Sequence, residues 1–286
     1  MRKILVATDL SARADRAIRR ATLLAKRFEA SLHLVHVVDD DRPRRIIDPE
    51  RDAAVEILDK QARSLREFDG VNCTASVVLG RLADEIVKAA QEAAADVVVV
   101  GSHRHRAIQD VFVGTTAERT IRSSRQPLLV ANGVPANLYR HILAAVDFSD
   151  CSADALLAIA ALGLDRDVAI SVLHVFDAPA RKHMSLASAS RGDVQHYIGS
   201  EEADAGRELA SFIQRTVAFP TRHLVKLRET TAPHAICTAA EEVSADLIVV
   251  GTHGRTGIAK FLLGSVAQGV LHAADQDVLT IPARRD

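Results

Sequence analysis

The stretch ADLIVVGTHGRTGIAKFLLGS, residues 245–265, joins a short apolar run, a glycine-rich loop and the start of a helix-like run. The apolar run is typical of a buried strand. Gly251 follows it directly, Gly254 and Gly264 come next, and VAQGVLHAA begins after Ser265. Glycine permits φ > 0 and a close approach of the backbone to a ligand, and the N–H groups at a helix N-terminus favour a phosphate. The stretch predicts a phosphate-binding loop, whereas the alternative is that these glycines serve only tight turns.

The same pattern occurs once more, as ADVVVVGSHRHRAIQDVFVGT at 95–115, with Arg104 in the place of Gly254. Other blocks also recur in the same order: ILVATDLS (4–11) as ILAAVDFS (142–149), LVHVVD (34–39) as VLHVFD (172–177), and QPLLV (126–130) as QDVLT (276–280). Ordered recurrence indicates a tandem duplication. We expect one domain at 1–133 and a second at 138–286, because Gly133 and Pro135 interrupt both helix and strand between them.

Each copy alternates apolar strands with helical patterns. We expect strands at 3–8, 31–38, 72–78, 96–100 and 127–131, and again at 141–146, 168–175, 222–228, 246–250 and 277–281. Near-continuous apolar strands separated by helices predict an α/β fold with a parallel sheet covered on both faces, and therefore a doubly wound sheet in each domain. The final strands, 127–131 and 277–281, are expected to pair the two copies about a pseudo-twofold axis, because unpaired edge strands expose backbone groups. The polar segment 178–200 is expected to be a mobile loop.

Composition excludes several classes of protein. The 286 residues carry a formal net charge of −1, 3% aromatic residues and no Trp, which argues against a nucleic-acid-binding protein. The longest apolar run is too short to span a bilayer, so no membrane association is expected. Cys73, Cys151 and Cys237 are widely spaced, which fits a reducing cytoplasm and argues against disulfides or a thiolate metal site.

Both copies resemble universal stress protein domains over nearly the whole chain. The second copy matches the ATP-binding signature of that family, G-x2-G-x9-G-[ST], and AVDFS (145–149) and LHVFD (173–177) resemble its first two strand ends. The resemblance implies five parallel strands per domain in the order 3-2-1-4-5. It also implies a site for ATP, with or without Mg²⁺. In that site Ala145, Val146, Asp147 and Val175 line the adenine and ribose, and Val250, Gly251, His253, Gly254, Gly264, Ser265 and Val266 surround the ribose and phosphates.

The first copy departs from this signature at Arg104, and His105, Gln109 and Asp110 add bulk and charge. Arg104 could clash with a phosphate or could grip one. We favour the loss of ordinary ATP binding in this copy, because a non-glycine residue tolerates fewer backbone conformations. Asp9, Gly101, Gly114 and Thr115 remain as weaker candidates for a site there.

No metal site is expected. His33 and His36 lie three apart on a strand and face opposite ways, and His103 and His105 fit a solvated basic loop better than a metal site. Residues 251–265 contain no carboxylate to act as a base and no Walker lysine, so slow ATP hydrolysis stays open but a dedicated ATPase is not expected.

Three functions remain after this reading. The first is a cytoplasmic stress-response protein that binds ATP in its second domain. The second is an interaction scaffold without nucleotide, and the third is an adenine-nucleotide hydrolase of the same fold. The complete second motif argues against the scaffold, and the missing SGGxDS loop argues against the hydrolase. A homodimer of the whole chain stays open.

Overall fold

The computed structural model describes residues 1–12, 14–102, 115–186, 190–254 and 263–283. The first copy contains nine elements: β1 (Lys3–Ala7), α1 (Ala14–Phe28), β2 (Ser31–Val38), α2 (Arg44–Glu67), β3 (Cys73–Leu79), α3 (Leu82–Glu92), β4 (Val97–Gly101), α4 (Thr115–Ser123) and β5 (Leu128–Ala131). The second copy contains β6 (His141–Val146), α5 (Asp150–Ala161), β7 (Ala169–Phe176), α6 (Ala180–Leu186), α7 (Arg191–Thr216), β8 (Arg222–Leu227), α8 (Ala232–Glu242), β9 (Leu247–Gly251), α9 (Ser265–Ala273) and β10 (Asp277–Ile281). The predicted alternation of strands and helices is confirmed.

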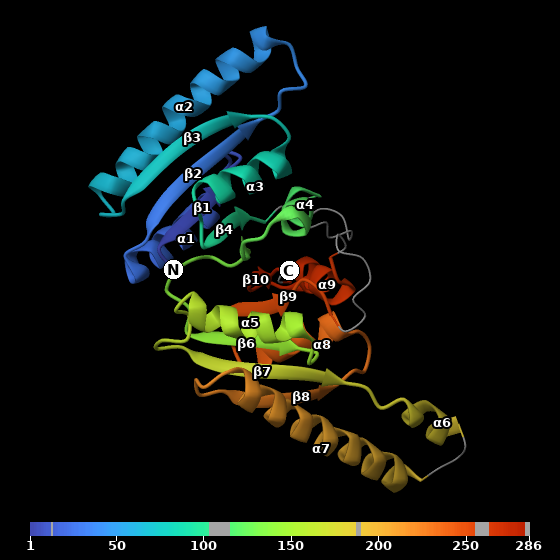
Figure 1. The fold of residues 1–286 in the computed structure, drawn as a ribbon. Helices are drawn as coiled ribbons and strands as arrows, with labels where there is room; N and C mark the ends of the chain where they lie inside the picture. Colours follow the sequence, from blue (N-terminus) through green and yellow to red (C-terminus); the bar gives the residue numbers. More distant parts are fainter. Residues whose placement is uncertain (13, 103–114, 187–189, 255–262, 284–286) are drawn as a thin grey trace.

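The strands form one continuous sheet of ten, in the order β3-β2-β1-β4-β5-β10-β9-β6-β7-β8. Within each copy the strands are parallel and follow the order 3-2-1-4-5. The copies join where β5 and β10 pair antiparallel, with Val130 opposite Val278 and Leu129 opposite Leu279. The expected pairing of the two final strands is therefore confirmed. Figure 1 shows the two copies on either side of this junction.

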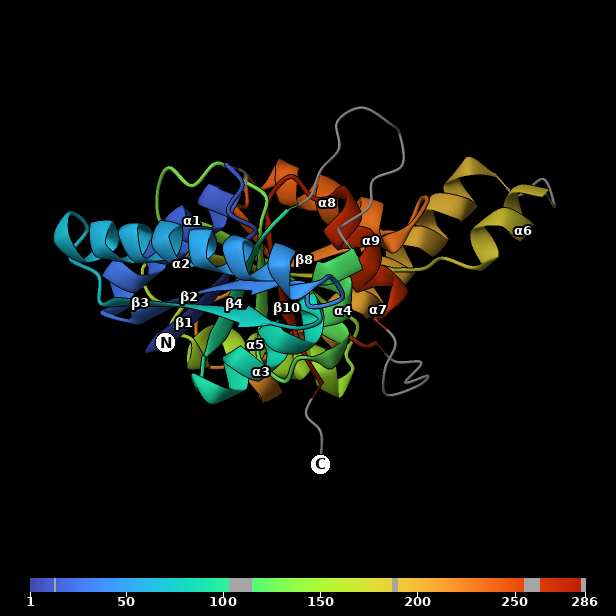
Figure 2. The same cartoon turned by 90° about the horizontal axis from the view of Figure 1, so that it is seen from above.

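Helices cover both faces of this sheet (Figure 2). Alternate strand residues pack into two cores, because successive side chains of a strand point to opposite faces. Ile4 and Val6 belong to the core beneath α1, α2, α5 and α7, whereas Leu5 belongs to the core beneath α3, α4, α8 and α9. Each core runs through both copies, so the two copies share one folded body.

The duplication extends to the backbone. Leu10 and Phe148, which occupy equivalent positions after the first strand of each copy, both adopt positive φ, at 61° and 66°. Asp96 accepts a hydrogen bond from the N–H of Lys3 at 3.0 Å, and its equivalent Asp246 accepts one from the N–H of His141 at 3.1 Å. The two copies therefore share loop geometry after their first strands and hydrogen bonding at the amino ends of their strands.

A buried carboxylate, Asp277, ties the copies together at the start of β10. Its side chain is 1% exposed and accepts hydrogen bonds from Arg20 Nε and Tyr139 OH, each at 2.7 Å. It also accepts from the backbone N–H groups of Asn132 and Gly133, each at 2.9 Å. The Arg20 guanidinium lies 4.3 Å from the centre of the Tyr139 ring. Asp277 thus contacts the first copy, the connecting segment and the second copy, which makes it the hub of the junction.

This hub predicts a loss of stability at alkaline pH. Burial, reinforced by the charge of Asp277, raises the pKa of Tyr139 well above its ordinary value of 10.0. As the pH rises above about 10, the unfolded chain loses this proton while the folded chain keeps it, so the folded state loses up to about 1.4 kcal/mol per pH unit. Tyr139→Phe lacks this ionisation. We therefore expect urea titrations to show that wild type loses stability relative to Tyr139→Phe between pH 10 and 11, by about 1 kcal/mol. A difference that stays constant from pH 8 to pH 11 would contradict the assignment.

The expectation of a mobile loop at 178–200 is wrong for most of that segment. Residues 180–186 form α6, and α7 begins at Arg191. Ser190 caps α7 in a reciprocal capping box with Asp193, and Tyr197 OH accepts a hydrogen bond from the N–H of Ala180 at 3.3 Å. The cap and the hydrogen bond to Tyr197 satisfy backbone N–H groups at the starts of both helices, which is why this polar segment is helical. Residues 187–189 lie outside the described residues.

Candidate functional site

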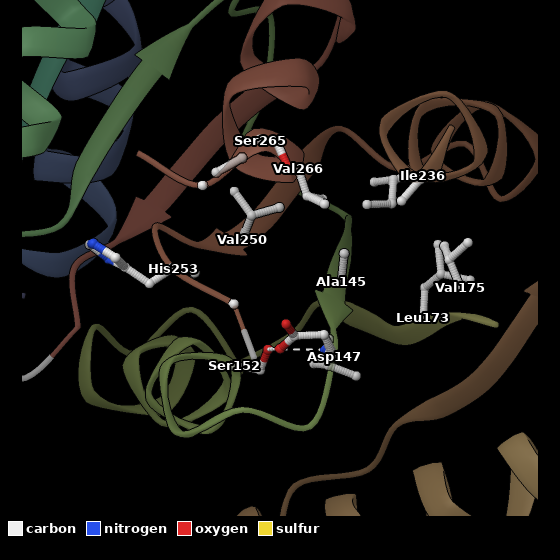
Figure 3. Close-up of a pocket in the computed structure, with 16 residues that line it drawn as sticks. Ala145, Asp147, Ser152, Leu173, Val175, Ile236, Val250, His253, Ser265 and Val266 are labelled. Carbon is white, nitrogen blue, oxygen red and sulfur yellow. Dashed lines mark hydrogen bonds between the residues drawn. The ribbon is translucent and has the colours of Figure 1, made fainter. Parts of the chain in front are cut away.

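A cavity of about 310 Å³ lies at the carboxyl ends of β6, β7 and β9. All of the predicted second-copy site residues line it: Ala145, Val146, Asp147, Val175, Val250, Gly251, His253, Gly254, Gly264, Ser265 and Val266. Ligands of open α/β sheets bind outside the carboxyl ends of the strands. Residues far apart in the sequence thus lie together at the strand ends where ligands bind in such a fold (Figure 3).

One side of the cavity is apolar. Leu173 and Val175 project from β7, and Ile236 projects from α8 to face them (Figure 3). Val266, at the start of α9, is 39% exposed although it is a large apolar residue. Together these side chains make a slot whose walls suit a flat apolar group, because burial of such surface is favourable and requires no polar partner.

The other side of the cavity is polar and centres on Asp147, which is half-buried. Its Oδ1 accepts hydrogen bonds from the hydroxyls of Ser149 at 2.5 Å and Ser152 at 2.6 Å. The Asp147 N–H in turn donates to Ser152 Oγ at 3.0 Å (Figure 3). Ser149 also caps α5, since its hydroxyl accepts from the N–H of Ser152. The start of α5 therefore fixes the orientation of this carboxylate.

Neighbouring atoms crowd all three motif glycines. A Cβ on Gly254 would lie 2.6 Å from Asp147 Oδ2, one on Gly251 would lie 2.8 Å from Cys151 Sγ, and one on Gly264 would lie 3.1 Å from the Thr252 oxygen. None of the three adopts a φ in the left-handed region. Of the two properties of glycine that the sequence analysis considered, φ > 0 is not used here, and the limited space for a side chain is the steric reason for glycine at these positions.

Helix α9 begins at this cavity, as the sequence predicts. Gly264 is its N-cap and offers no side chain to the first N–H groups of the helix. The Gly264 N–H donates to the Thr252 oxygen at 2.7 Å, which holds the helix start against the end of β9. The first turn of a helix carries unsatisfied N–H groups and the positive end of the helix dipole. The arrangement can therefore receive an anionic group.

Comparison with known proteins agrees with this reading. The model of the universal stress protein family matches residues 1–132 and 138–282. The chain belongs to the universal stress protein family.

Two relatives and one solved structure illustrate the match. Universal stress protein A homolog 1 of Coxiella burnetii is 34% identical over 144 residues, which cover 50% of this chain and 96% of that protein. A universal stress protein of Mycolicibacterium smegmatis is 26% identical over 305 residues and covers 98% of this chain and 97% of its own. The crystal structure of a universal stress protein from Archaeoglobus fulgidus has a TM-score of 0.72 at 19% identity and covers 99% of this chain and 98% of its own. The resemblance to a tandem universal stress protein is confirmed.

In this universal stress protein, the ring of His253 points away from the rest of the cavity lining (Figure 3). Its Nδ1 lies 2.9 Å from Thr252 Oγ1, and its buried Nε2 has no hydrogen-bond partner among the described residues. His253 was expected among the residues around a ribose and phosphates. The structure places its backbone at the cavity, whereas its imidazole is directed elsewhere.

Cys151 lies directly behind Gly251 and is buried. Burial raises the pKa of its thiol, although hydrogen bonds from the His253 and Thr252 backbone and the Thr252 hydroxyl act in the opposite direction. A thiol with a raised pKa is a poor nucleophile near neutral pH. Cys151 therefore serves as packing beneath the loop, and Cys73 and Cys237 are likewise buried thiols outside any disulfide.

Sequence reasoning missed part of the lining, namely Ser152, Leu173, Ala232, Ile236 and Ala267. A signal existed for some of them. Leu173 lies two residues before Val175 on the same strand face, and Ala232 and Ile236 are four apart on one helix face. Ser152 follows the Ser149 cap by three residues, which is where a capping serine reaches the backbone.

The first-copy candidates are only partly described. Asp9 follows β1 and Gly101 ends β4, a strand paired with β1, so both lie at carboxyl ends of neighbouring strands. Thr115 is the first residue of α4. Asp9 is exposed and accepts from Ser11 Oγ at 2.6 Å, but Ala14 stands where the second copy has Ser152. The remaining first-copy loop residues that the sequence singled out lie outside the described residues: His103, Arg104, His105, Gln109, Asp110 and Gly114.

The histidines of β2 contact different partners. His33 lies 2.9 Å from both Thr74 Oγ1 and Ser76 Oγ, whereas His36 lies 2.9 Å from the Thr8 oxygen. The expectation that they face opposite ways is confirmed. Within the described part of the chain, the grouping that could hold a metal ion is Asp39–Asp41, and all three of these residues are exposed. Among the described helices, none combines the length and apolar character that crossing a bilayer requires.

Proposed function

We propose that this universal stress protein binds ATP in its second domain, residues 138–286, as a regulatory ligand of the stress response, with little or no hydrolysis. The observation that carries the proposal is the single cavity in which the predicted residues meet, because an apolar slot, the Asp147 carboxylate and the uncapped start of α9 all line it. This combination matches the two ends of a nucleotide.

The proposed pose follows from the chemistry of the lining. The adenine would occupy the slot between Val175 and Ile236, where its faces meet apolar side chains. The ribose hydroxyls would donate to Asp147, since an oriented carboxylate forms strong hydrogen bonds with hydroxyls. The phosphates would extend past Gly254 towards the N–H groups of Ser265 and Val266.

Slow or absent hydrolysis follows from the same lining. Among the described lining residues, Asp147 alone carries a carboxylate, and both of its neighbouring serines donate to it. In the proposed pose it faces the ribose and is separated from the γ-phosphate by the α- and β-phosphates. A base or water-positioning group near that phosphate is what hydrolysis requires. We also propose that the protein acts in the cytoplasm, where three buried thiols that form no disulfide stay reduced.

Calorimetric titration of the full chain tests the proposal. We expect saturable binding of about one ATP per chain, because the second copy alone carries the complete motif. A universal stress protein has been solved in complex with cAMP, so cAMP belongs in the same series, as does ATP with and without Mg²⁺. Phosphate release should remain near the background rate over hours. Saturable binding of two ATP per chain would contradict the assignment to one domain, and no binding would favour a scaffold without nucleotide.

A further inference from the structure

A second cavity, of about 190 Å³, lies between the two copies. In the second copy it lies at the amino ends of the strands, whereas the proposed nucleotide site lies at their carboxyl ends. The first copy contributes Arg27 and Phe28, the last residues of α1. The second contributes Leu138 and Arg140, which precede β6, and Arg166 and Val168, which precede β7. These segments lie at the amino ends of their strands, on the side where β7 begins in Figure 1. We call this cavity the arginine groove.

The rim of the groove carries an excess of positive charge. Three arginines and one carboxylate, Asp167, line it. Asp167 pairs with Arg27 at 2.6 Å, but its side chain is 88% exposed, and exposed ion pairs are weak. The guanidinium groups of Arg140 and Arg166 have no hydrogen-bond or ion-pair partner among the described residues. Two unpaired guanidinium groups therefore remain beside one cavity.

The floor of the groove is apolar. Phe28 and Val168 are half-buried, and Leu138 is 37% exposed at the mouth. Gly163 adopts φ +75° beside this floor, and a Cβ there would lie 3.3 Å from the Phe28 ring. The turn that carries Arg166 therefore packs closely against α1 of the other copy. This close packing forms the floor from both copies.

We propose that the arginine groove binds a small organic anion, a carboxylate with a short apolar body. The apolar body would cover Phe28, Leu138 and Val168, and the carboxylate would pair with Arg140 and Arg166, which suits the planar fork of a guanidinium group. A cavity of about 190 Å³ is smaller than the roughly 300–1,000 Å³ of sites for drug-sized ligands, so the ligand is small. Because both copies contribute, occupancy holds them together and raises the stability of the whole chain.

Sodium hexanoate is a suitable probe, with 1-hexanol as its uncharged counterpart and sodium chloride as the ionic-strength control. Backbone amide chemical shifts of the full chain are followed with saturating ATP present, so that the nucleotide site is blocked. We expect saturable shifts at 138–140 and 163–168 with an affinity that is roughly millimolar, as suits so few atoms. 1-Hexanol should bind at least about tenfold more weakly, because it cannot pair with the arginines.

Substitutions locate the effect. Arg140→Gln and Arg166→Gln should each weaken hexanoate binding about tenfold, the loss of one charge-assisted hydrogen bond. Arg191→Gln makes the same change of charge at an exposed position at the start of α7 and should leave binding unchanged. The proposal is overturned if wild type shows no saturable shift at these segments, if 1-hexanol binds equally well, or if Arg191→Gln weakens binding as much as the groove variants.

Discussion

Asp277→Asn is expected to lower the free energy of unfolding by about 3–5 kcal/mol, because it removes one charge of a buried pair and leaves the other unpaired. Arg20 and Asp277 are 5% and 1% exposed, and their side chains meet at 2.7 Å. Asparagine keeps the shape of the side chain but offers one acceptor oxygen where four donors converge. The variant therefore also leaves backbone N–H groups of the connecting segment without a full partner.

Asp167→Asn provides the matched control for this prediction. Asp167 pairs with Arg27 at 2.6 Å, a similar distance, but its side chain is 88% exposed. We expect this variant to lose no more than about 1 kcal/mol. Urea unfolding of both variants, followed by circular dichroism, gives the comparison. If Asp277→Asn costs as little as Asp167→Asn, the junction does not depend on this hub.

Gly254→Arg is expected to weaken ATP binding about a hundredfold, equivalent to roughly 2.7 kcal/mol, while the thermal midpoint changes little. Any side chain at this position begins 2.6 Å from Asp147 Oδ2, so either the loop or the carboxylate must move. Moving Asp147 costs the charge-assisted hydrogen bonds that we assign to the ribose, worth about 1.5–3 kcal/mol. The arginine could recover part of this loss by contacting a phosphate, which keeps the loss finite.

Two further variants isolate the cause of that loss. Gly199→Ala places a methyl group where no neighbouring atom lies within 4 Å. It should leave ATP affinity unchanged and should not lower stability. Arg104→Gly restores the glycine in the first copy but should not create an equal second site. Ala14 there has no hydroxyl to orient Asp9, and Leu82, 44% exposed, stands in the place of Ala232. Unchanged ATP affinity in Gly254→Arg would show that this glycine only shapes a turn.

The features that follow from local pattern were predictable from the sequence. Short apolar runs such as residues 97–100 predict buried strands, and the recurrence of ILVATDLS as ILAAVDFS indicates the duplication. Once both copies end in an apolar edge strand, the β5–β10 pairing follows from the cost of leaving backbone groups unpaired. The cavity lining from β6, β9 and α9 follows from the same strand ends and the glycine motif.

Features that depend on tertiary contacts were not predictable. Gly251 and Gly254 are crowded by Cys151 and Asp147, and a local sequence pattern contains no information on the distance to a residue about a hundred positions away. The hub at Asp277 was not predictable either, because the repeat gives no hint of it and its partners are far apart in the sequence. Its equivalent in the first copy is Pro127. Helix α6 was missed because its docking onto α7 outweighs a composition that is typical of loops.

The central claim is that one nucleotide occupies the second domain. The most direct test is to denature freshly purified wild type and Gly254→Arg, each reloaded with excess ATP and desalted, and to quantify the released adenine nucleotide by mass spectrometry. We predict about one nucleotide per chain from wild type and close to none from the variant, with intact folds in both. Wild type that releases no nucleotide, or a variant that releases as much as wild type, would contradict the account.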